Sequence, residues 1–416
     1  MKKTLIIAGI LGAFAAAGSA QAQSSVTLYG SLDAGLVYVN NVAGGHGYWG
    51  VDSGALSPTY FGLRGNEDLG YGTSAFFDLE EGFNLNNGQA SAGNWLTGAQ
   101  GMWTRYAYVG LKNNQFGSLS FGKQSDEVED YLGPLALAGQ AGGINLAGHP
   151  FNNDNVMSLY TYDNTVKYAS PKWSGPWGAF DFGATYSFSN STDFIANRAY
   201  SVGAGYSWGP LKFGAAYNQI NSDKYNWGGV GTGGAAALNY DPTTGTVTGG
   251  APGVFGADVQ RTFGVGANYG FNLGGHAGSV GVLWTQTNLQ GVNDLAAPAG
   301  LGHNRFDNIE INGTYMITPA LAAVANYTYT WTKGLARPTA TGAEGSSAKF
   351  HSVTLGLDYG LSKRTDVYLA GVYQHASGNV ADGTDGSYYN PAGISVIPAA
   401  DAANQVGAAI GIRHRF

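Results

Sequence analysis

The sequence has 416 residues, a formal net charge of −7, 11% charged residues and no cysteine. The mildly acidic charge argues against nucleic acid as a partner, and the lack of cysteine excludes a disulfide framework and a zinc–thiolate site. Ordinary soluble domains contain about 25% charged residues. This chain is therefore poor in charge, while it is rich in glycine (67 residues) and tyrosine (26 residues).

The N-terminus has the layout of a secretory signal peptide. Met1–Lys3 is positively charged, Thr4–Ala17 is almost wholly apolar or small, and Gly18–Ala22 offers a small-residue cleavage site. The apolar run is too short for a membrane-spanning helix, and its two ends disfavour a buried N-terminal helix. We expect residues 1–22 to be removed on export. Losing the two lysines there would change the net charge from −7 to −9 and leave residues 23–416 as one domain.

Further along the chain, no apolar run approaches the ~20 residues that a membrane-spanning helix needs. Instead, apolar side chains alternate with small or polar ones, as in Phe180–Ser189, Ala199–Trp208 and Leu321–Trp331. A period of two gathers the apolar side chains on one face of a strand. This pattern favours a transmembrane β-barrel, in which lipid covers the apolar face and the opposite face lines a water-filled interior.

Sixteen segments with this alternation are predicted as strands, and no linker of different composition separates them. In chain order they start near Val26, Thr59, Thr73, Thr104, Gly117, Ser158, Phe180, Ala199, Leu211, Asp258, His276, Arg305, Ala320, Phe350, Thr365 and Asn404.

The connections between the predicted strands alternate between long and short. The long ones are 40–58, 83–103, 126–155, 190–198, 220–257, 288–304, 333–349 and 376–403, and the short ones include 66–72, 112–116, 209–210, 270–275, 318–319 and 360–364. Alternate connections of an antiparallel barrel lie on opposite rims. Long loops on one rim and tight turns on the other are typical of outer-membrane barrels. The fold class is therefore all-β: a transmembrane antiparallel β-barrel of 16 strands with short periplasmic turns and long extracellular loops, in the cell outer membrane.

The last predicted strand includes VGAAIGIRHRF, residues Val406–Phe416. Its alternation places Ile410 and Ile412 on the lipid side and both Arg413 and Arg415 on the opposite side, in the lumen or the periplasmic mouth. An open edge in lipid would leave backbone groups without hydrogen bonds. We therefore expect this strand to pair with the first one and close the barrel.

Six stretches resemble a known family, the trimeric Gram-negative general porins, in their neisserial and betaproteobacterial branch. They are SSVTLYGSLDAGL (24–36), GLRGNEDLGYGTSAFFDLEEGF (62–83), TRYAYVGLKNNQFGSLSFGKQ (104–124), NTVKYASP (164–171), YGLSKRTDVYL (359–369) and VGAAIGIRHRF (406–416). The resemblance implies a homotrimer of sixteen-stranded barrels whose third extracellular loop folds inward to narrow the pore. Outer-membrane lipid, lipopolysaccharide and the barrel-assembly machinery are the implied partners, and Phe416 resembles the assembly signal that this machinery reads.

The third long connection opens with four acids: Asp126, Glu127, Glu129 and Asp130. One interpretation is a solvated loop patch, since charge runs usually face water. The other, implied by the resemblance, is that these acids line the constriction opposite basic side chains of the barrel wall. Acids that face bases across a narrow aqueous gap would create a transverse field and bias the choice of ions.

Candidate wall residues come from the neighbouring strands. The alternation of the second strand puts Tyr60 and Arg64 on the lumen side. Arg105 and Lys123 stand where the resembling family carries wall cations, whereas Tyr60 and Thr161 stand where it commonly has arginine. This loss of positive charge predicts a weaker anion preference than is usual in that branch, or none. Tyr60 is either a neutral spacer or a ring able to stack on a sugar or aromatic solute.

The sequence contains no recognisable catalytic motif, and Gly264-Val265-Gly266 lies within a predicted strand with no helix after it, unlike a dinucleotide fingerprint. We therefore expect no enzymatic activity, no cofactor and no metal. A small barrel acting as an adhesin is disfavoured by chain length and loop number. The prediction is passive diffusion of small hydrophilic solutes and ions through a water-filled channel. A substrate-selective channel for a sugar or aromatic solute on the same barrel is the alternative.

Overall fold

We describe the fold from a computed structural model of the chain. It describes residues 25–90, 102–140, 143–189, 192, 194, 198–221, 239–241, 246–248, 257–292, 302–334, 347–378, 391–398 and 400–416. The predicted signal peptide lies outside these ranges.

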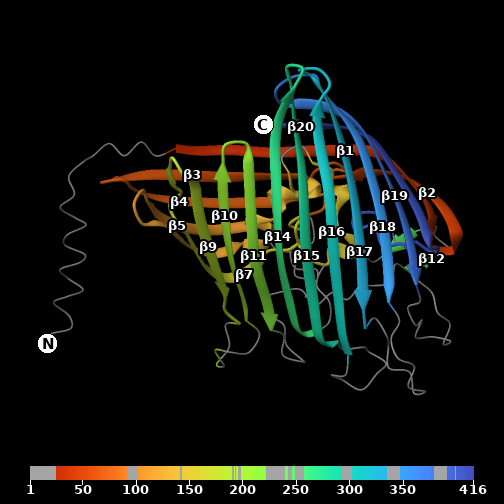
Figure 1. The fold of residues 1–416 in the computed structure, drawn as a ribbon, viewed down its shortest axis with the longest axis horizontal. Helices are drawn as coiled ribbons and strands as arrows, with labels where there is room; N and C mark the ends of the chain where they lie inside the picture. The colour runs from red at the N-terminus through yellow and green to blue at the C-terminus, as the bar shows by residue number, and fades with distance from the viewer. Residues whose placement is uncertain are drawn as a thin grey trace.

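Sixteen strands of the described residues form a closed antiparallel barrel (Figure 1), as the sequence predicts. They are β1 (Ser25–Val42), β3 (Tyr60–Gly70), β4 (Thr73–Gly82), β5 (Tyr106–Asn113), β6 (Gly117–Gln124), β7 (Tyr162–Ala169), β9 (Gly178–Ser187), β10 (Ala199–Trp208), β11 (Leu211–Asn221), β14 (Ala257–Leu273), β15 (His276–Val292), β16 (Gly302–Met316), β17 (Leu321–Lys333), β18 (Ala348–Gly360), β19 (Thr365–Gly378) and β20 (Asn404–Arg415). Every predicted start has an observed counterpart. The largest offset lies between Ser158 and Tyr162, where β7 begins.

The structure corrects the extent of the first long connection, predicted over 40–58. This segment contains strand β2 (His46–Ser53), which pairs with β1 from Ala34 to Val42, while β3 pairs with β1 from Ser25 to Ser31. Together β2 and β3 satisfy the backbone groups along one edge of β1. Three shorter strands complete the list: β8 (Trp173–Gly175), which pairs with β9, and the separate hairpin of β12 (Asn239–Asp241) and β13 (Thr246–Thr248).

The barrel closes through the pairing of β1 with β20, which runs from Ser31 opposite Arg415 to Val39 opposite Gly407. Beyond β20, the Gly30 and Phe416 backbones exchange two hydrogen bonds of 3.1 Å each. A Cβ atom on Gly30 would lie 2.6 Å from the Phe416 ring, so only glycine leaves room for the aromatic side chain there. The predicted closing strand is thus confirmed.

The wall alternates between an apolar outer face and a polar inner face. Along β17, Thr328, Thr330 and Thr332 are fully buried on the inner side, whereas Tyr327 is 40% exposed on the outer side. The described residues contain no helix long and apolar enough to cross a membrane.

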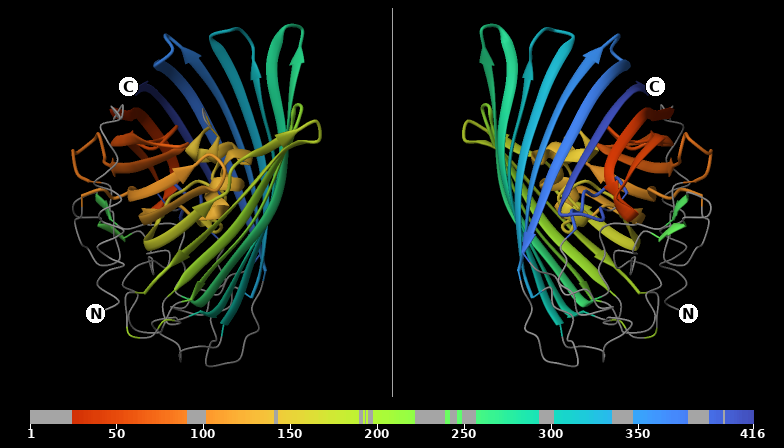
Figure 2. Two further views of the ribbon diagram at one scale, coloured as in Figure 1. Left: turned by 90° about the vertical axis from the view of Figure 1, so that its left-hand side faces the viewer. Right: turned by 90° about the vertical axis from the view of Figure 1, so that its right-hand side faces the viewer.

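The third long connection lies inside the barrel, surrounded by strands in Figure 2. It contains helix α2 (Glu127–Tyr131) and the short 3-10 turns η2 (Gly133–Leu135), η3 (Leu137–Gly139), η4 (Asn145–Ala147) and η5 (Pro150–Asn152). Its apolar side chains pack on the inner wall: Val128, Leu132 and Leu135 meet Ala216 and Leu283. An apolar interior patch is unusual for an aqueous channel, and it holds the connection against the wall.

A second segment also lies inside the barrel. Ile394, from residues 391–398, belongs to one buried cluster with Leu137 and Ile144 of the third connection and Val372 of β19. Backbone hydrogen bonds join the two segments, since Phe151 donates to the Gly393 carbonyl over 3.1 Å. The last long connection is therefore partly internal, which the alternation of strands and loops did not predict.

Candidate functional site

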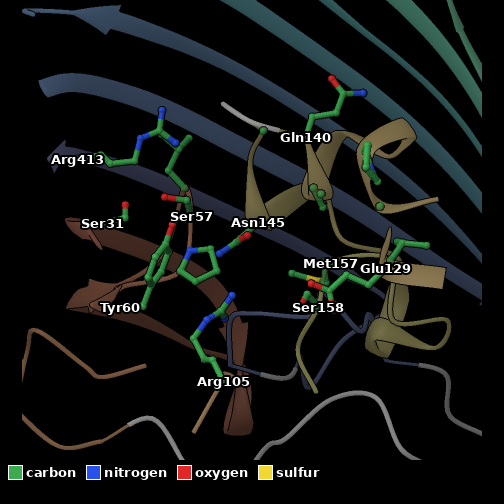
Figure 3. A pocket seen from close by; sticks show the side chains of 18 of the residues that line it. Ser31, Ser57, Tyr60, Arg105, Glu129, Gln140, Asn145, Met157, Ser158 and Arg413 are labelled. Carbon is green, nitrogen blue, oxygen red and sulfur yellow. The ribbon is translucent and has the colours of Figure 1, made fainter. Parts of the chain in front are cut away.

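A cavity of about 550 Å³ lies between the third connection and the wall formed by β1, β3 and β20. Figure 3 shows Tyr60, Arg105 and Arg413 on one side of it and Glu129 and Gln140 on the other. Basic side chains of the wall and an acid of the third connection thus border one space.

Arg105 is held by neighbours on the wall. Its Nε lies 2.5 Å from Glu80 Oε1 on β4, and its guanidinium lies over the rings of Tyr60, at 5.2 Å, and Tyr106, at 5.7 Å. Charge-assisted contacts and cation–π contacts both restrict the side chain to one place. Tyr60 lines the cavity, but one face of its ring is already covered by Arg105.

Arg64 takes part in the same inner-wall network. Its guanidinium lies 4.5 Å from the centre of the Tyr29 ring, and the Tyr29 hydroxyl donates to Asp78, at 2.5 Å, and to Glu80, at 3.0 Å. Asp78 is the direct cross-strand neighbour of Arg64. The two wall acids were missed in the sequence, although alternation along β4 places both of them on the face that Arg64 shares.

Two further arginines line the cavity from β20. Arg413 is buried between Asp358, at 2.9 Å, and Asp366, at 3.0 Å, and the Arg415 guanidinium also contacts Asp366. Both face inward, in agreement with the alternation of the closing strand.

Asp126 and Glu127 do not line the cavity, because they are buried against the wall. Asp126 caps α2 by accepting from the Glu129 amide at 2.9 Å, and burial raises the pKa of Asp126 to about 6. Glu127 accepts from Thr185 on β9 at 2.8 Å, and burial raises the pKa of Glu127 to about 8. These two acids attach the third connection to the barrel.

Glu129 and Asp130 do line the cavity. The Tyr106 hydroxyl donates to Glu129 at 2.6 Å. Burial, together with the nearby Asp130 carboxylate, raises the pKa of Glu129 to about 7. Asp130 is ion-paired with Lys167 of β7 over 2.5 Å.

Lys123 and Thr161 lie outside this group. Lys123 is opposite Ala107 and forms an ion pair with Asp163 over 2.6 Å, on the face of β6 that also carries the exposed Phe121. Thr161 directly precedes β7. The structure therefore brings together Tyr60, Arg105, Glu129 and Asp130 of the predicted constriction, with Arg64 in the adjoining network.

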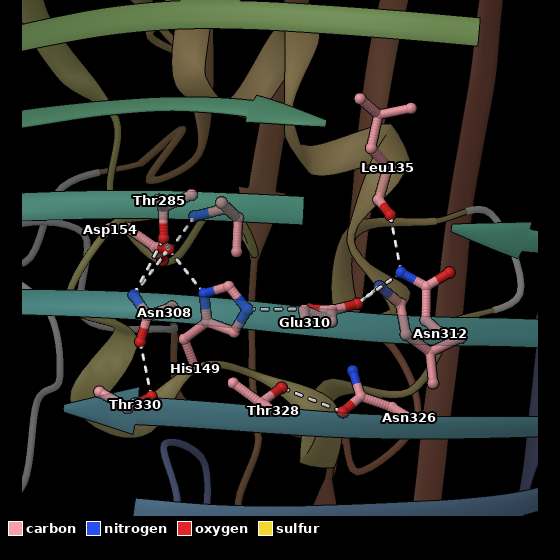
Figure 4. A network of polar contacts seen from close by, with 12 residues as sticks. Leu135, His149, Asp154, Thr285, Asn308, Glu310, Asn312, Asn326, Thr328 and Thr330 are labelled. Carbon is pink, nitrogen blue, oxygen red and sulfur yellow. Dashed lines mark hydrogen bonds and ion pairs between the residues drawn. The ribbon is translucent and has the colours of Figure 1, made fainter. Parts of the chain in front are cut away.

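A buried histidine fixes the far part of the third connection (Figure 4). His149 Nδ1 lies 2.6 Å from Asp154, which also accepts from Thr285 of β15, and Nε2 lies 2.8 Å from Glu310 of β16. Burial opposes the imidazolium, but Asp154 and Glu310 outweigh it and raise the pKa of His149 to about 10. Burial also opposes ionisation of Asp154, but the contacts with His149 and Thr285 outweigh it and lower the pKa of Asp154. The sequence contains no signal for this network, because its members are distant along the chain.

Within the described ranges, no cluster of three or more His, Asp or Glu side chains is arranged to hold a metal ion.

Comparisons with known proteins agree with this architecture. The chain matches the Gram-negative porin family over residues 8–379. An outer membrane porin protein of Bordetella pertussis is 29% identical over the full length of both chains. Outer membrane porin protein 32 of Delftia acidovorans is 34% identical over 45% of this chain and 50% of its own length.

Solved structures share the fold. The anion-selective porin from Comamonas acidovorans has a TM-score of 0.63 at 22% identity, covering 95% of this chain and all of its own. OmpT of Vibrio cholerae, which is also described in a trimer form, has a TM-score of 0.57 at 20% identity, covering 94% of this chain and 99% of that one. The chain is a multi-pass β-barrel of the outer membrane and belongs to the Gram-negative porin family.

Proposed function

We propose that this porin is a passive diffusion channel for small hydrophilic solutes and ions, with its constriction at the cavity between the third connection and the β1–β3–β20 wall. The observation that carries the proposal is the placement of Arg105, Arg413 and Arg415 on the wall and Glu129 and Asp130 on the connection around one space. Such an arrangement orients polar solutes without binding them tightly.

The charges of this constriction are largely compensated, which supports weak ion selectivity. Arg105 is paired with Glu80, Arg413 is shared by two aspartates, and Asp130 is paired with Lys167. A paired charge contributes little to the field across the pore, because the partner's opposite field cancels most of it. Reversal potentials in planar bilayers under a salt gradient test this point. Values near zero are expected, and a strongly anion-selective potential would refute it.

A substrate-selective channel is the second candidate, because Tyr60 lines the cavity. Its ring is able to stack on a sugar or aromatic solute only if Arg105 moves away or the opposite ring face is open. Liposome swelling across a graded series of sugars separates the two functions. Rates that fall smoothly with solute size support general diffusion, whereas preference for one solute independent of its size would favour the selective channel.

We further propose the partners and processing that accompany such a channel. They are removal of residues 1–22, assembly as a homotrimer with Phe416 as the signal read by the barrel-assembly machinery, and contact with outer-membrane lipid and lipopolysaccharide. Family membership and the trimer form of a structural neighbour support the oligomer. The absence of enzymatic activity and of a cofactor stays a prediction.

A further inference from the structure

A second cavity, of about 240 Å³, adjoins the first one and shares with it Arg105, Asn145 and Ser158, which Figure 3 labels. Its other lining residues come mainly from the long connections, and they include Asp52 from the first, Asn84 from the second and Val396 from the last of them. The first cavity extends instead to the final residues of β20. The second cavity therefore lies nearer the rim of the long connections, and a solute entering there reaches it before the proposed constriction.

Asp52 contributes a carboxylate to this cavity. It lies on β2, where Trp49 and Val51 are 67% and 59% exposed on the outer face and Tyr48 packs on the buried apolar cluster inside the barrel. Alternation along the strand therefore turns Asp52 inward, together with Tyr48. The carboxylate accepts a hydrogen bond from the Ser53 amide at 2.8 Å, and it forms no ion pair with another described residue. A half-buried carboxylate without a cationic partner attracts a cation from the pore.

Arg105 borders the same cavity with hydrogen-bond donors that the wall leaves free. Its Nε donates to Glu80, whereas neither terminal nitrogen donates to another described residue. The side chain is 21% exposed, so part of it faces the cavities that it lines. Glu80 balances the charge of Arg105, but a guanidinium has five N–H donors and can bind a second carboxylate through its terminal nitrogens. The cavity thus offers both a carboxylate and a guanidinium to one solute.

The remaining lining limits the size and the polarity of that solute. Pro58, Leu159 and Val396 add apolar surface. The hydroxyls of Thr59 and Thr104 are already hydrogen-bonded to backbone groups of the wall, so a sugar would find few free partners. The volume holds roughly eight waters and is below the roughly 300–1,000 Å³ of pockets for drug-sized ligands. The solute is therefore a small molecule with an apolar part.

We propose that the second cavity is a subsite for a zwitterionic amino acid with an apolar side chain. The ammonium group pairs with Asp52, the carboxylate binds the terminal nitrogens of Arg105, and the side chain contacts the apolar surface of Leu159 and Val396. Opposite charges on one small solute match this lining, because each charge meets a partner of the other sign. The proposal rests on the proposed channel function and deepens it by naming a class of solute that gathers ahead of the constriction.

Saturation-transfer NMR on the full-length protein in deuterated detergent micelles tests the subsite with three solutes of one carbon skeleton. They are L-leucine, 3-methylbutylamine, which lacks the carboxylate, and 4-methylpentanoate, which lacks the ammonium group. The variants are Asp52→Asn and Arg105→Lys. The matched control is Glu67→Gln, which removes one carboxylate at the exposed end of β3, outside both cavities. Circular dichroism reports the folding of each protein, and planar-bilayer recording in potassium chloride reports conduction.

Wild type and Glu67→Gln should bind L-leucine roughly tenfold more tightly than either analogue, because each analogue loses one charge-assisted contact. Asp52→Asn should weaken L-leucine binding roughly tenfold and remove its advantage over 4-methylpentanoate. Arg105→Lys should narrow the advantage of L-leucine over the amine, because the planar fork of donors is lost.

Equal L-leucine affinity in Asp52→Asn and Glu67→Gln would overturn the subsite. An amine that binds wild type as tightly as L-leucine would reduce the site to a cation site and overturn the zwitterion. If Asp52→Asn does not fold, Arg105→Lys and the comparison of the three solutes on wild type decide the question. A wild type that conducts salt but binds no L-leucine would overturn the subsite alone, whereas one that binds L-leucine but does not conduct would refute the proposed channel alone.

Discussion

His149 Nε2 lies 2.8 Å from Glu310 Oε2, which joins the third connection to strand β16 inside the barrel. The other ring nitrogen binds Asp154, and the backbone carbonyl of His149 accepts a hydrogen bond from Ser395 of the last long connection. One buried residue thus links the barrel wall, through its side chain, and the last long connection, through its backbone, to the third connection. The position of the third connection depends on this link as well as on apolar packing.

The first prediction concerns the pH dependence of this link. The folded pKa of His149 is about 10, above the ordinary value of 6.5. Its contribution to stability is therefore fully present below about pH 6.5 and is lost as the pH rises through about 10. His149→Gln should lower the free energy of unfolding by about 3–5 kcal/mol at pH 6.5, because it leaves buried carboxylates unpaired. The loss should shrink toward pH 10.

Thermal unfolding in micelles, followed by circular dichroism between pH 6 and pH 10, measures this change. His303→Gln, at an exposed histidine, serves as the control and should keep the wild-type profile. If His149→Gln also keeps that profile, the imidazolium does not stabilise the third connection.

The second prediction concerns Glu129. Burial and Asp130 raise its pKa to about 7, so the constriction gains negative charge as the pH rises through neutrality. Cation preference, measured from reversal potentials at pH 6 and pH 8, should increase over this interval. Glu129→Gln should remove the increase. An unchanged pH dependence in this variant would show that another group titrates in the pore.

The third prediction concerns Glu80, whose carboxylate balances the positive charge of Arg105. Glu80 Oε1 lies 2.5 Å from Arg105 Nε. Glu80→Gln should free the positive charge of Arg105 and raise the anion-to-cation permeability ratio. A unit charge interacts with an ion 4 Å away in water with an energy of about 1 kcal/mol. This energy corresponds to roughly a fivefold change in the permeability ratio.

Reversal potentials under a salt gradient measure the change, with Glu67→Gln, at the exposed end of β3, as the matched control. Equal shifts in both variants would mean that net charge, rather than the Arg105 pair, sets selectivity.

The fourth prediction concerns Phe416, whose ring covers Gly30 and whose backbone pairs with it. Deleting Phe416 should reduce the amount of protein in the outer membrane severalfold. It should leave single-channel conductance unchanged, because the residue lies outside the cavity lining. Membrane fractionation and bilayer recording measure the two effects. Normal membrane levels of the deletion variant would exclude Phe416 as an assembly signal.

Much of the barrel could be predicted from local sequence. Segments such as Phe180–Ser189 alternate because one face meets lipid and the other meets water, and this requirement acts on each strand separately. The inward position of Arg413 and Arg415 follows from the same alternation. The strand β2 was missed because glycines and polar residues interrupt its pattern in HGYWGVDS.

The lining of the cavity could be predicted only in part. Arg105 and Glu129 both line the cavity where we propose the constriction, but Asp126 and Glu127 turn toward the wall, where Asp126 caps α2 and Glu127 binds Thr185. Nothing in a run of four acids distinguishes the two that are buried against the wall from the two that line the cavity. Packing of the third connection against residues from β9 to β16 makes that distinction.

The sequence by itself determined the number of barrel strands, the face that each one turns to lipid, and the closure of the barrel. These features depend on the alternation of apolar and polar side chains within each strand, which neighbouring residues specify. The tertiary structure alone decided which charges meet. Glu80 compensates Arg105, and Glu310 holds His149. These contacts depend on strand register and on the path of the internal connection, both of which are set by residues far apart along the chain.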